Sequence, residues 1–119
     1  RHARCASRPS GRAENDAMRT VRYSRTFYDE FAALLEQGIE RFGPKVAAEK
    51  RDRVFRTIER FIAAHPVRPI DRHIGLCAYL VGGTPFVLLY DYDDAEVRLH
   101  MIIHAHADRA QVDPSNVLW

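Results

Sequence analysis

The chain is 119 residues long, with 46% apolar and 29% charged residues, which is the composition of one small globular domain. A chain of this length can bury about two-thirds of the surface that its unfolded form exposes, so it can form a core without metal or disulfide staples. No apolar run approaches the roughly 20 residues of a membrane-spanning helix, and no membrane partner is expected. These limits exclude multidomain enzymes, membrane channels, coiled coils and repeat arrays.

The net charge of +2 resides in the N-terminal segment, where residues 1–17 hold four arginines, one glutamate and one aspartate. The rest of the chain carries 14 basic and 14 acidic side chains. A strongly basic surface for nucleic acid is therefore absent from the folded part, and any contact with RNA or DNA would need a local patch.

Residues 1–17 contain no Leu, Ile, Val, Phe, Tyr or Trp, so they cannot bury enough surface to offset the entropy of ordering them. We expect them to be disordered, or an upstream extension of a folded domain over 18–119 that truly begins at Met18. Cys5 and Cys77 predict no disulfide framework and form no CxxC pattern, and no apolar run follows the N-terminal arginines. Both features favour the cytoplasm, and Cys77, set in an apolar stretch, is expected to be a buried free thiol.

The first regular segment is predicted to be a short strand over Thr20–Tyr23 followed by a helix. Ser24 and Thr26 are candidates for the N-cap of this helix. Asp29 and Glu30 are then expected in its first turn, where the helix dipole favours negative charge.

Two helices are predicted as an antiparallel hairpin. The first is indicated by apolar residues at helical spacing, namely Phe27, Phe31, Leu34, Leu35, Ile39 and Phe42. Gly43 ends it, and Pro44 begins a second helix that extends to about Ala64, since the missing N–H of proline is harmless in a first turn. The charged side of this second helix is typical of a solvated face.

The second half of the chain predicts three strands. Two prolines make His65–Pro69 a loop, and the strands follow at Leu76–Val81, Pro85–Tyr92 and Glu96–His104. Because only short turns separate them, they form an antiparallel meander. The predicted fold class is therefore α+β, in the order β-α-α-β-β-β, with the helical hairpin packed on a four-stranded, mainly antiparallel sheet.

The last strand alternates between two kinds of residue. Val97, Leu99, Met101 and Ile103 are expected to face the helices, whereas Arg98, His100, Ile102 and His104 are expected to face solvent or a partner. The His/Arg character of the second face makes it the most informative surface in the sequence.

His104, His106 and Asp108 form an HxHxD pattern, and histidines two apart can converge on zinc. Hydrolases of the metallo-β-lactamase type begin their signature in this way, but they need further ligands well downstream. Only 11 residues follow Asp108, and Arg109 stands where that signature has histidine. No metal and no other cofactor is therefore expected.

An RNase-like site is the enzymatic alternative. His104 and His106 beside Arg109 could deprotonate a ribose hydroxyl while the arginine stabilises phosphate charge, and Tyr90 could stack on a base. Such residues equally fit the rim of a sheet that binds a protein, so this pattern leaves both readings open.

The order of several segments resembles toxins of the ParE/RelE superfamily from bacterial type II toxin–antitoxin systems. Gly82–Arg109 is similar to the C-terminal half of these toxins, with an aromatic-rich strand, an acidic turn and a final strand that ends in IIHAHADR. ERFGPKVAAE at Glu40–Glu49 is similar to their turn between helices, and FIAAHP at Phe61–Pro66 to their exit from the second helix. The resemblance covers residues 18–119.

This resemblance implies a toxin held inactive by a cognate antitoxin, whose extended and helical segments would lie over the helical hairpin and the sheet edge. ParE-like members are associated with inhibition of DNA gyrase, whereas RelE-like members cleave mRNA on the ribosome. Val87 stands where RelE-type nucleases usually have arginine, lysine occurs only at Lys45 and Lys50, and the body is neutral. These departures favour the ParE branch, although His104, His106 and Arg109 favour the nuclease.

A ParE-like toxin would act by protein contact and would need no catalytic residue. The resemblance places the contact with gyrase in the C-terminal part of the chain. The expected target-binding residues are Arg98, His104, His106, Asp108, Arg109 and Trp119. Trp119 either packs back on the sheet or is an exposed anchor, since tryptophan is favoured at binding hot spots.

Overall fold

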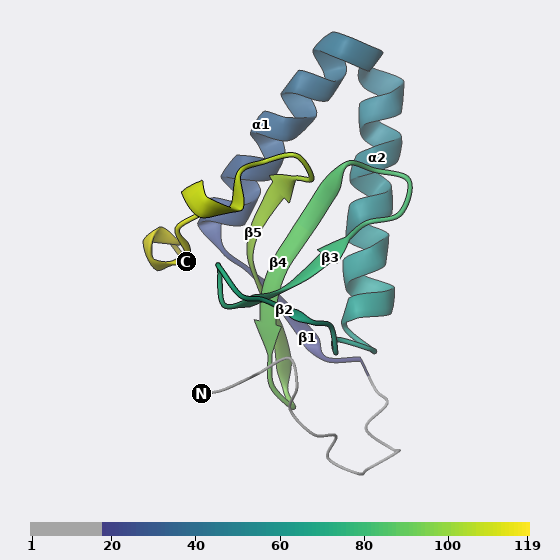
Figure 1. The fold of residues 1–119 in the computed structure, drawn as a ribbon. Helices are drawn as coiled ribbons and strands as arrows, with labels where there is room; N and C mark the ends of the chain where they lie inside the picture. Colours follow the sequence, from purple (N-terminus) through teal and green to yellow (C-terminus); the bar gives the residue numbers. More distant parts are fainter. Residues whose placement is uncertain (1–17) are drawn as a thin grey trace.

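The computed structural model describes residues 18–119, and the expectations about residues 1–17 lie outside this part of the chain. The elements follow in the order β1 (Thr20–Tyr23), α1 (Arg25–Phe42), α2 (Pro44–Arg56), η3 (Thr57–Ile62), β2 (Ile70–Asp71), β3 (Leu76–Leu80), β4 (Phe86–Tyr92), β5 (Glu96–His104), η4 (Arg109–Gln111) and η5 (Pro114–Asn116). The strands form one sheet in the order β1-β5-β4-β3-β2, with β1 parallel to β5 and the other pairs antiparallel. The two long helices cover one face of this sheet (Figure 1).

The predicted α+β class and helical hairpin are confirmed, and two details are corrected. The sheet has five strands, not four, because Ile70–Asp71 pairs with the start of β3. A strand of two residues is too short to show any alternation. The second helix is not uniform to Ala64, because its last turns are a π-helix in which the N–H of Ala63 donates to the carbonyl of Ile58. The wider turn leaves Ile58, Ile62 and Ala63 all buried.

Helix α1 begins on Ser24, one of the two expected N-caps. The buried Ser24 hydroxyl accepts from the N–H of Phe27 and donates to the carbonyl of His100 in β5, both at 2.7 Å. The first turn consequently ends before Asp29 and Glu30, so their expected place in that turn is wrong. Glu30 instead accepts from the N–H of Ile102, at 3.1 Å, where β1 has ended and no longer covers β5. Burial raises the pKa of Glu30, and this N–H only partly offsets it.

A β-bulge in β5 corrects the expected faces of this strand. Leu99 pairs with Tyr90 and Met101 with Leu89, so His100 is an extra residue in the ladder. Alternation therefore changes sides at the bulge. Val97 and Leu99 face the helices as expected, but Met101 and Ile103 lie on the opposite face and Ile102 takes the helix side.

Each face of the sheet has its own core. The larger one joins α1 and α2 to the sheet through residues such as Phe27, Phe31, Val54, Ile58 and Leu88. The smaller one consists of Ile74, Leu76, Val87, Leu89, Met101 and Ile103, against which Ala105, Ala107, Val112 and Val117 pack. The C-terminal segment thus covers the face that the helices leave open.

Cys77 is completely buried, as expected, but it is disulfide-bonded, so the expectation of a free thiol is wrong. This removes one of the two features that favoured the cytoplasm. None of the helices within residues 18–119 is long and apolar enough to cross a membrane.

Candidate functional site

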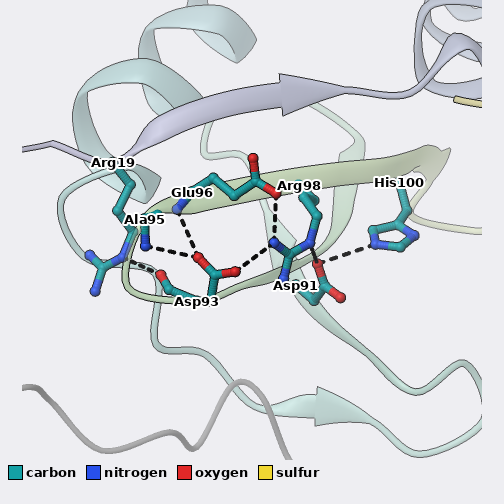
Figure 2. A network of polar contacts seen from close by, with 7 residues as sticks. All are labelled: Arg19, Asp91, Asp93, Ala95, Glu96, Arg98 and His100. Carbon is teal, nitrogen blue, oxygen red and sulfur yellow. Dashed lines mark hydrogen bonds and ion pairs between the residues drawn. The ribbon is translucent and has the colours of Figure 1, made fainter.

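Arg98 is the centre of an ion-pair network where β4 turns into β5 (Figure 2). Its guanidinium donates to Asp91 at 2.7 Å, to Glu96 at 2.7 Å and to Asp93 at 2.9 Å. The Arg98 side chain is only 16% exposed. The structure therefore places this expected target-binding residue inside a network, where its N–H groups donate to carboxylates of the same chain.

Two carboxylates of the network, those of Asp91 and Asp93, have lowered pKa values that favour their charged form. Burial opposes ionisation of Asp91, but His100 and Arg98 outweigh it and hold the pKa of Asp91 below its usual value. Asp93 behaves in the same way, since Arg98 and the N–H groups of Ala95 and Glu96 lower its pKa against a smaller effect of burial. Burial lowers the pKa of Arg98, but its three carboxylates raise it overall.

Trp119 packs back on the sheet beside this network. Its ring meets that of His100 edge-on, with centroids 4.8 Å apart, and the guanidinium of Arg22 lies 4.9 Å from the Trp119 ring centre. His100 Nε2 lies 3.3 Å from Asp91 Oδ1, an ion-pair distance for a protonated ring, although the alignment is not that of a hydrogen bond. Trp119 remains 46% exposed. Its ring therefore contacts His100 and Arg22 and still presents surface to solvent.

The neighbouring Leu118 completes the N-terminus of α1. The N–H of Thr26 donates to the carbonyl of Leu118 at 3.2 Å, and the N–H of Leu118 donates to the Thr26 hydroxyl at 2.8 Å. Thr26, the second expected N-cap, therefore holds the C-terminal segment in place. The Leu118 side chain is 65% exposed.

The HxHxD residues lie in and just after the end of β5. The N–H of His106 donates to Nδ1 of His104 at 3.1 Å, and the two rings lie 5.3 Å apart. Asp108 caps η4 by accepting from the N–H of Ala110. Within residues 18–119, no three histidine, cysteine or acidic side chains are placed to hold a metal ion.

Arg109 is paired within the chain, and its side chain is half-buried. Its Nη1 donates to Asp71 in β2 at 2.5 Å, and the Asp71 side chain is 12% exposed. Burial acts against ionisation of Asp71, but Arg109 and the N–H groups of His73 and Ile74 lower its pKa overall. This pair ties the C-terminal segment to the opposite edge of the sheet.

Tyr90 does not join the histidines. Its side chain is completely buried in the helix-side core, and its hydroxyl donates to the carbonyl of Pro66 at 2.6 Å. Burial raises the pKa of this hydroxyl. The ring is thus closed to a stacking base.

The sequence patterns did not reveal three acidic partners. Asp71 pairs with Arg109, Asp91 pairs with Arg98, and Glu30 accepts from the N–H of Ile102. For Asp91 a signal existed, because the predicted hairpin places it directly opposite Arg98. Asp71 and Glu30 are 38 and 72 residues from their partners, and no local pattern connects them.

An apolar stripe follows one side of α1, at the margin of the helix-side core. Tyr28, Ala32, Leu35, Ile39 and Phe42 recur every three or four residues, which places them on one helix face. Tyr28, Ile39 and Phe42 are 50%, 45% and 61% exposed. The turn that follows Phe42 projects beyond the sheet (Figure 1). Several exposed apolar side chains on one helix face are a feature of many binding faces.

Comparison with solved structures confirms the expected resemblance in fold. A chain of the chromosomal ParDE TA system from P. aeruginosa superposes on this protein with a TM-score of 0.60 at 13% sequence identity, covering 73% of this chain and 96% of its own length. No protein-family model matches the sequence, and no curated protein matches it. The likeness therefore rests on the arrangement of two helices on the sheet.

Proposed function

We propose that this chain is the toxin of a type II toxin–antitoxin module, that it acts in the cytoplasm by contact with DNA gyrase, and that a cognate antitoxin neutralises it. The observation that carries the proposal is the architecture shared with a chain of a ParDE system. The proposed action requires no bond making, only a surface that fits the target.

The geometry supports protein contact over RNA cleavage. Of the four residues that an RNase-like site would use, Tyr90 is buried, Arg109 is paired with Asp71, and Nδ1 of His104 accepts from the main chain. A general base and a phosphate-binding cation must both reach the substrate. Of these four residues, all of which the structure describes, only His106 is exposed and has no such partner for its side chain.

The contact with gyrase is assigned to the exposed part of the C-terminal segment. His106 and Asp108 are exposed beyond the end of β5, and Leu118 and Trp119 offer the largest apolar surface there. Aromatic anchors of this kind dominate binding energy at interfaces. In this proposal Arg98 and Arg109 do not contact gyrase. Their ion pairs hold the supporting strand and the C-terminal segment in position.

The apolar stripe on α1 supports an antitoxin partner. An amphipathic helix could bury Tyr28, Ile39 and Phe42 by placing its own apolar face along them. Coverage of the helical hairpin agrees with the resemblance, which implies an antitoxin that lies over this part of the chain.

The order in which cellular processes stop tests the target. The protein is induced in a bacterium without antitoxin, and incorporation of labelled thymidine and methionine is followed in one culture. We expect DNA synthesis to fall first, and purified gyrase to lose supercoiling activity when the protein is added. Earlier collapse of methionine incorporation would overturn the proposal in favour of ribosome-dependent cleavage.

Two variants separate the candidate residues. The His104→Ala/His106→Ala double variant should remain fully toxic, because the proposed action needs no acid–base group. The Leu118→Ala/Trp119→Ala double variant should lose most toxicity, since hot-spot truncations each weaken binding by about tenfold or more. Thermal melting of both proteins is the control. Loss of toxicity in the histidine variant while it stays folded would contradict the proposal.

A further inference from the structure

A row of basic side chains runs along α2 and its π-helical extension η3. Its members follow one another at steps of three, three and four residues, so each lies near the next on one side of the helix. They are Lys50, Arg53, Arg56 and Arg60, and the three arginines are exposed. We refer to these four residues, together with Arg68 from the loop that follows, as the basic row.

The basic row has no acidic partner within the part of the chain that the structure describes. None of its five cations forms an ion pair with a carboxylate of residues 18–119. Asp52 stands four residues before Arg56, a spacing that allows a pair, but its carboxylate pairs with Arg51. The positive charge of the row is therefore not neutralised by ion pairs, although residues 18–119 carry equal numbers of basic and acidic side chains.

The turn between β3 and β4 positions two members of the row. Lys50 Nζ donates to the carbonyl of Gly83 at 3.4 Å. A side chain at Gly83 would place its Cβ only 3.2 Å from Nε of Arg53, so Arg53 lies directly against this glycine. Neutral groups thus hold both cations, which leaves their charge available to an anion.

Arg68 distinguishes between two kinds of polyanion. Its guanidinium lies 4.7 Å from the ring centre of Phe61 and 4.8 Å from that of Tyr79. Proteins that bind single-stranded nucleic acid stack bases on aromatic faces beside a basic groove. Here a cation of the row itself lies over the neighbouring rings, so the row offers contacts to phosphate and no stacking platform. Phosphate contacts alone are the sequence-independent way to bind duplex DNA.

We propose that the basic row binds the phosphate backbone of duplex DNA without reading its sequence. The cations lie in line along one rigid helix, and the phosphates of a duplex are fixed in rows, so several contacts form without ordering a flexible strand. An acidic protein segment carries the same sign of charge, and the test separates it from DNA. The inference stands on this row alone and does not depend on the proposed action on gyrase.

Fluorescence anisotropy tests the proposal with the full chain and a labelled duplex of about 20 base pairs, two turns of DNA. If three or four cations each neutralise a phosphate, affinity should fall roughly 40- to 150-fold between about 50 and 200 mM salt. Two duplexes of unrelated sequence should bind equally. Tighter binding of single-stranded DNA or RNA of equal length, equal competition by polyglutamate, or no binding at the lower salt concentration would each overturn the proposal.

Charge variants locate the contact. Arg53→Gln/Arg56→Gln should weaken duplex binding by about tenfold or more and reduce the slope of log affinity against log salt by about 2, since two phosphate contacts are lost. Arg41→Gln/Arg72→Gln removes the same charge elsewhere on the surface and should leave both quantities unchanged. Equal losses in the two variants would overturn the assignment.

Thermal melting of both variants is the control for folding. If the first variant does not fold, the unaltered protein provides the answer through NMR. The side-chain Nε resonances of Arg56 and Arg60 should then shift when duplex DNA is added. Shifts confined to residues outside the basic row would overturn the proposal.

Discussion

Replacement of Arg98 by methionine should destabilise the protein by about 2–4 kcal/mol at neutral pH, because it leaves a buried carboxylate without its main partner. Asp91 is 13% exposed and loses a 2.7 Å charge-assisted bond. Removal of one member of a buried pair typically costs about 3–5 kcal/mol, and the remaining contact with His100 reduces that figure. Asp93 and Glu96 are 52% and 29% exposed, so they return to water at little cost.

Thermal unfolding followed by circular dichroism measures this effect. For a domain of about this size, each kcal/mol changes Tm by about 3–5 °C, so the variant should melt roughly 6–20 °C below the unaltered protein at pH 7. Arg51→Met is the matched control. Arg51 pairs with Asp52 where the two side chains are 49% and 59% exposed, and its removal should change stability by no more than about 0.5 kcal/mol.

The pH dependence gives a second check on Arg98. Because the pKa of Asp91 is lowered in the folded protein, its contribution is present above the unfolded pKa of about 3.9 and is lost as the pH falls through the folded pKa. In the variant, Arg98 no longer lowers the pKa of Asp91, so the effect of burial raises that pKa relative to the unaltered protein and favours the protonated acid. The difference in Tm should therefore narrow below about pH 4. A Tm difference that is small at pH 7, or that grows in acid, would show that the pairing of Arg98 with Asp91 does not stabilise the fold.

Three other substitutions should reduce stability, each measured by thermal unfolding. Ser24→Ala should cost about 1–3 kcal/mol, because it removes the cap of α1 and leaves the carbonyl of His100 without its donor; no change would show that water replaces the hydroxyl. Tyr90→Phe should cost about 1 kcal/mol through the lost bond to Pro66, with toxicity unaffected. Gly43→Ala should cost about 1 kcal/mol, since Gly43 has φ of 90° and open space around it, so that only backbone strain acts; a more stable variant would contradict that reason.

Local patterns predicted most of the fold. The bounds of β1 and β5 match the predicted strands, and Gly43 and Pro44 mark the turn between the helices as expected. Strand alternation, helix spacing and the conformational limits of glycine and proline act over a few neighbouring residues. They can therefore be read before any tertiary contact is known.

The bulge at His100 could not be predicted in this way. An extra residue arises from the register between β4 and β5, which no single strand encodes. Its consequence is large, because it moves Met101 and Ile103 from the expected helix side to a second core. That core explains why the segment after β5 folds back over the sheet.

At the candidate site, the residue types of the last strand and the C-terminal segment can be known from the sequence, but which of these side chains can reach a partner depends on the folded arrangement. His104, His106, Arg98 and Arg109 were all expected to face a target. Asp71 and Asp91 pair with the two arginines. Leu118 and Trp119 keep exposed apolar surface, although the first turn of α1 and His100 hold them in place. The physical reason is that the availability of a charged or aromatic side chain depends on partners distant in sequence, and only the assembled sheet brings those partners within contact.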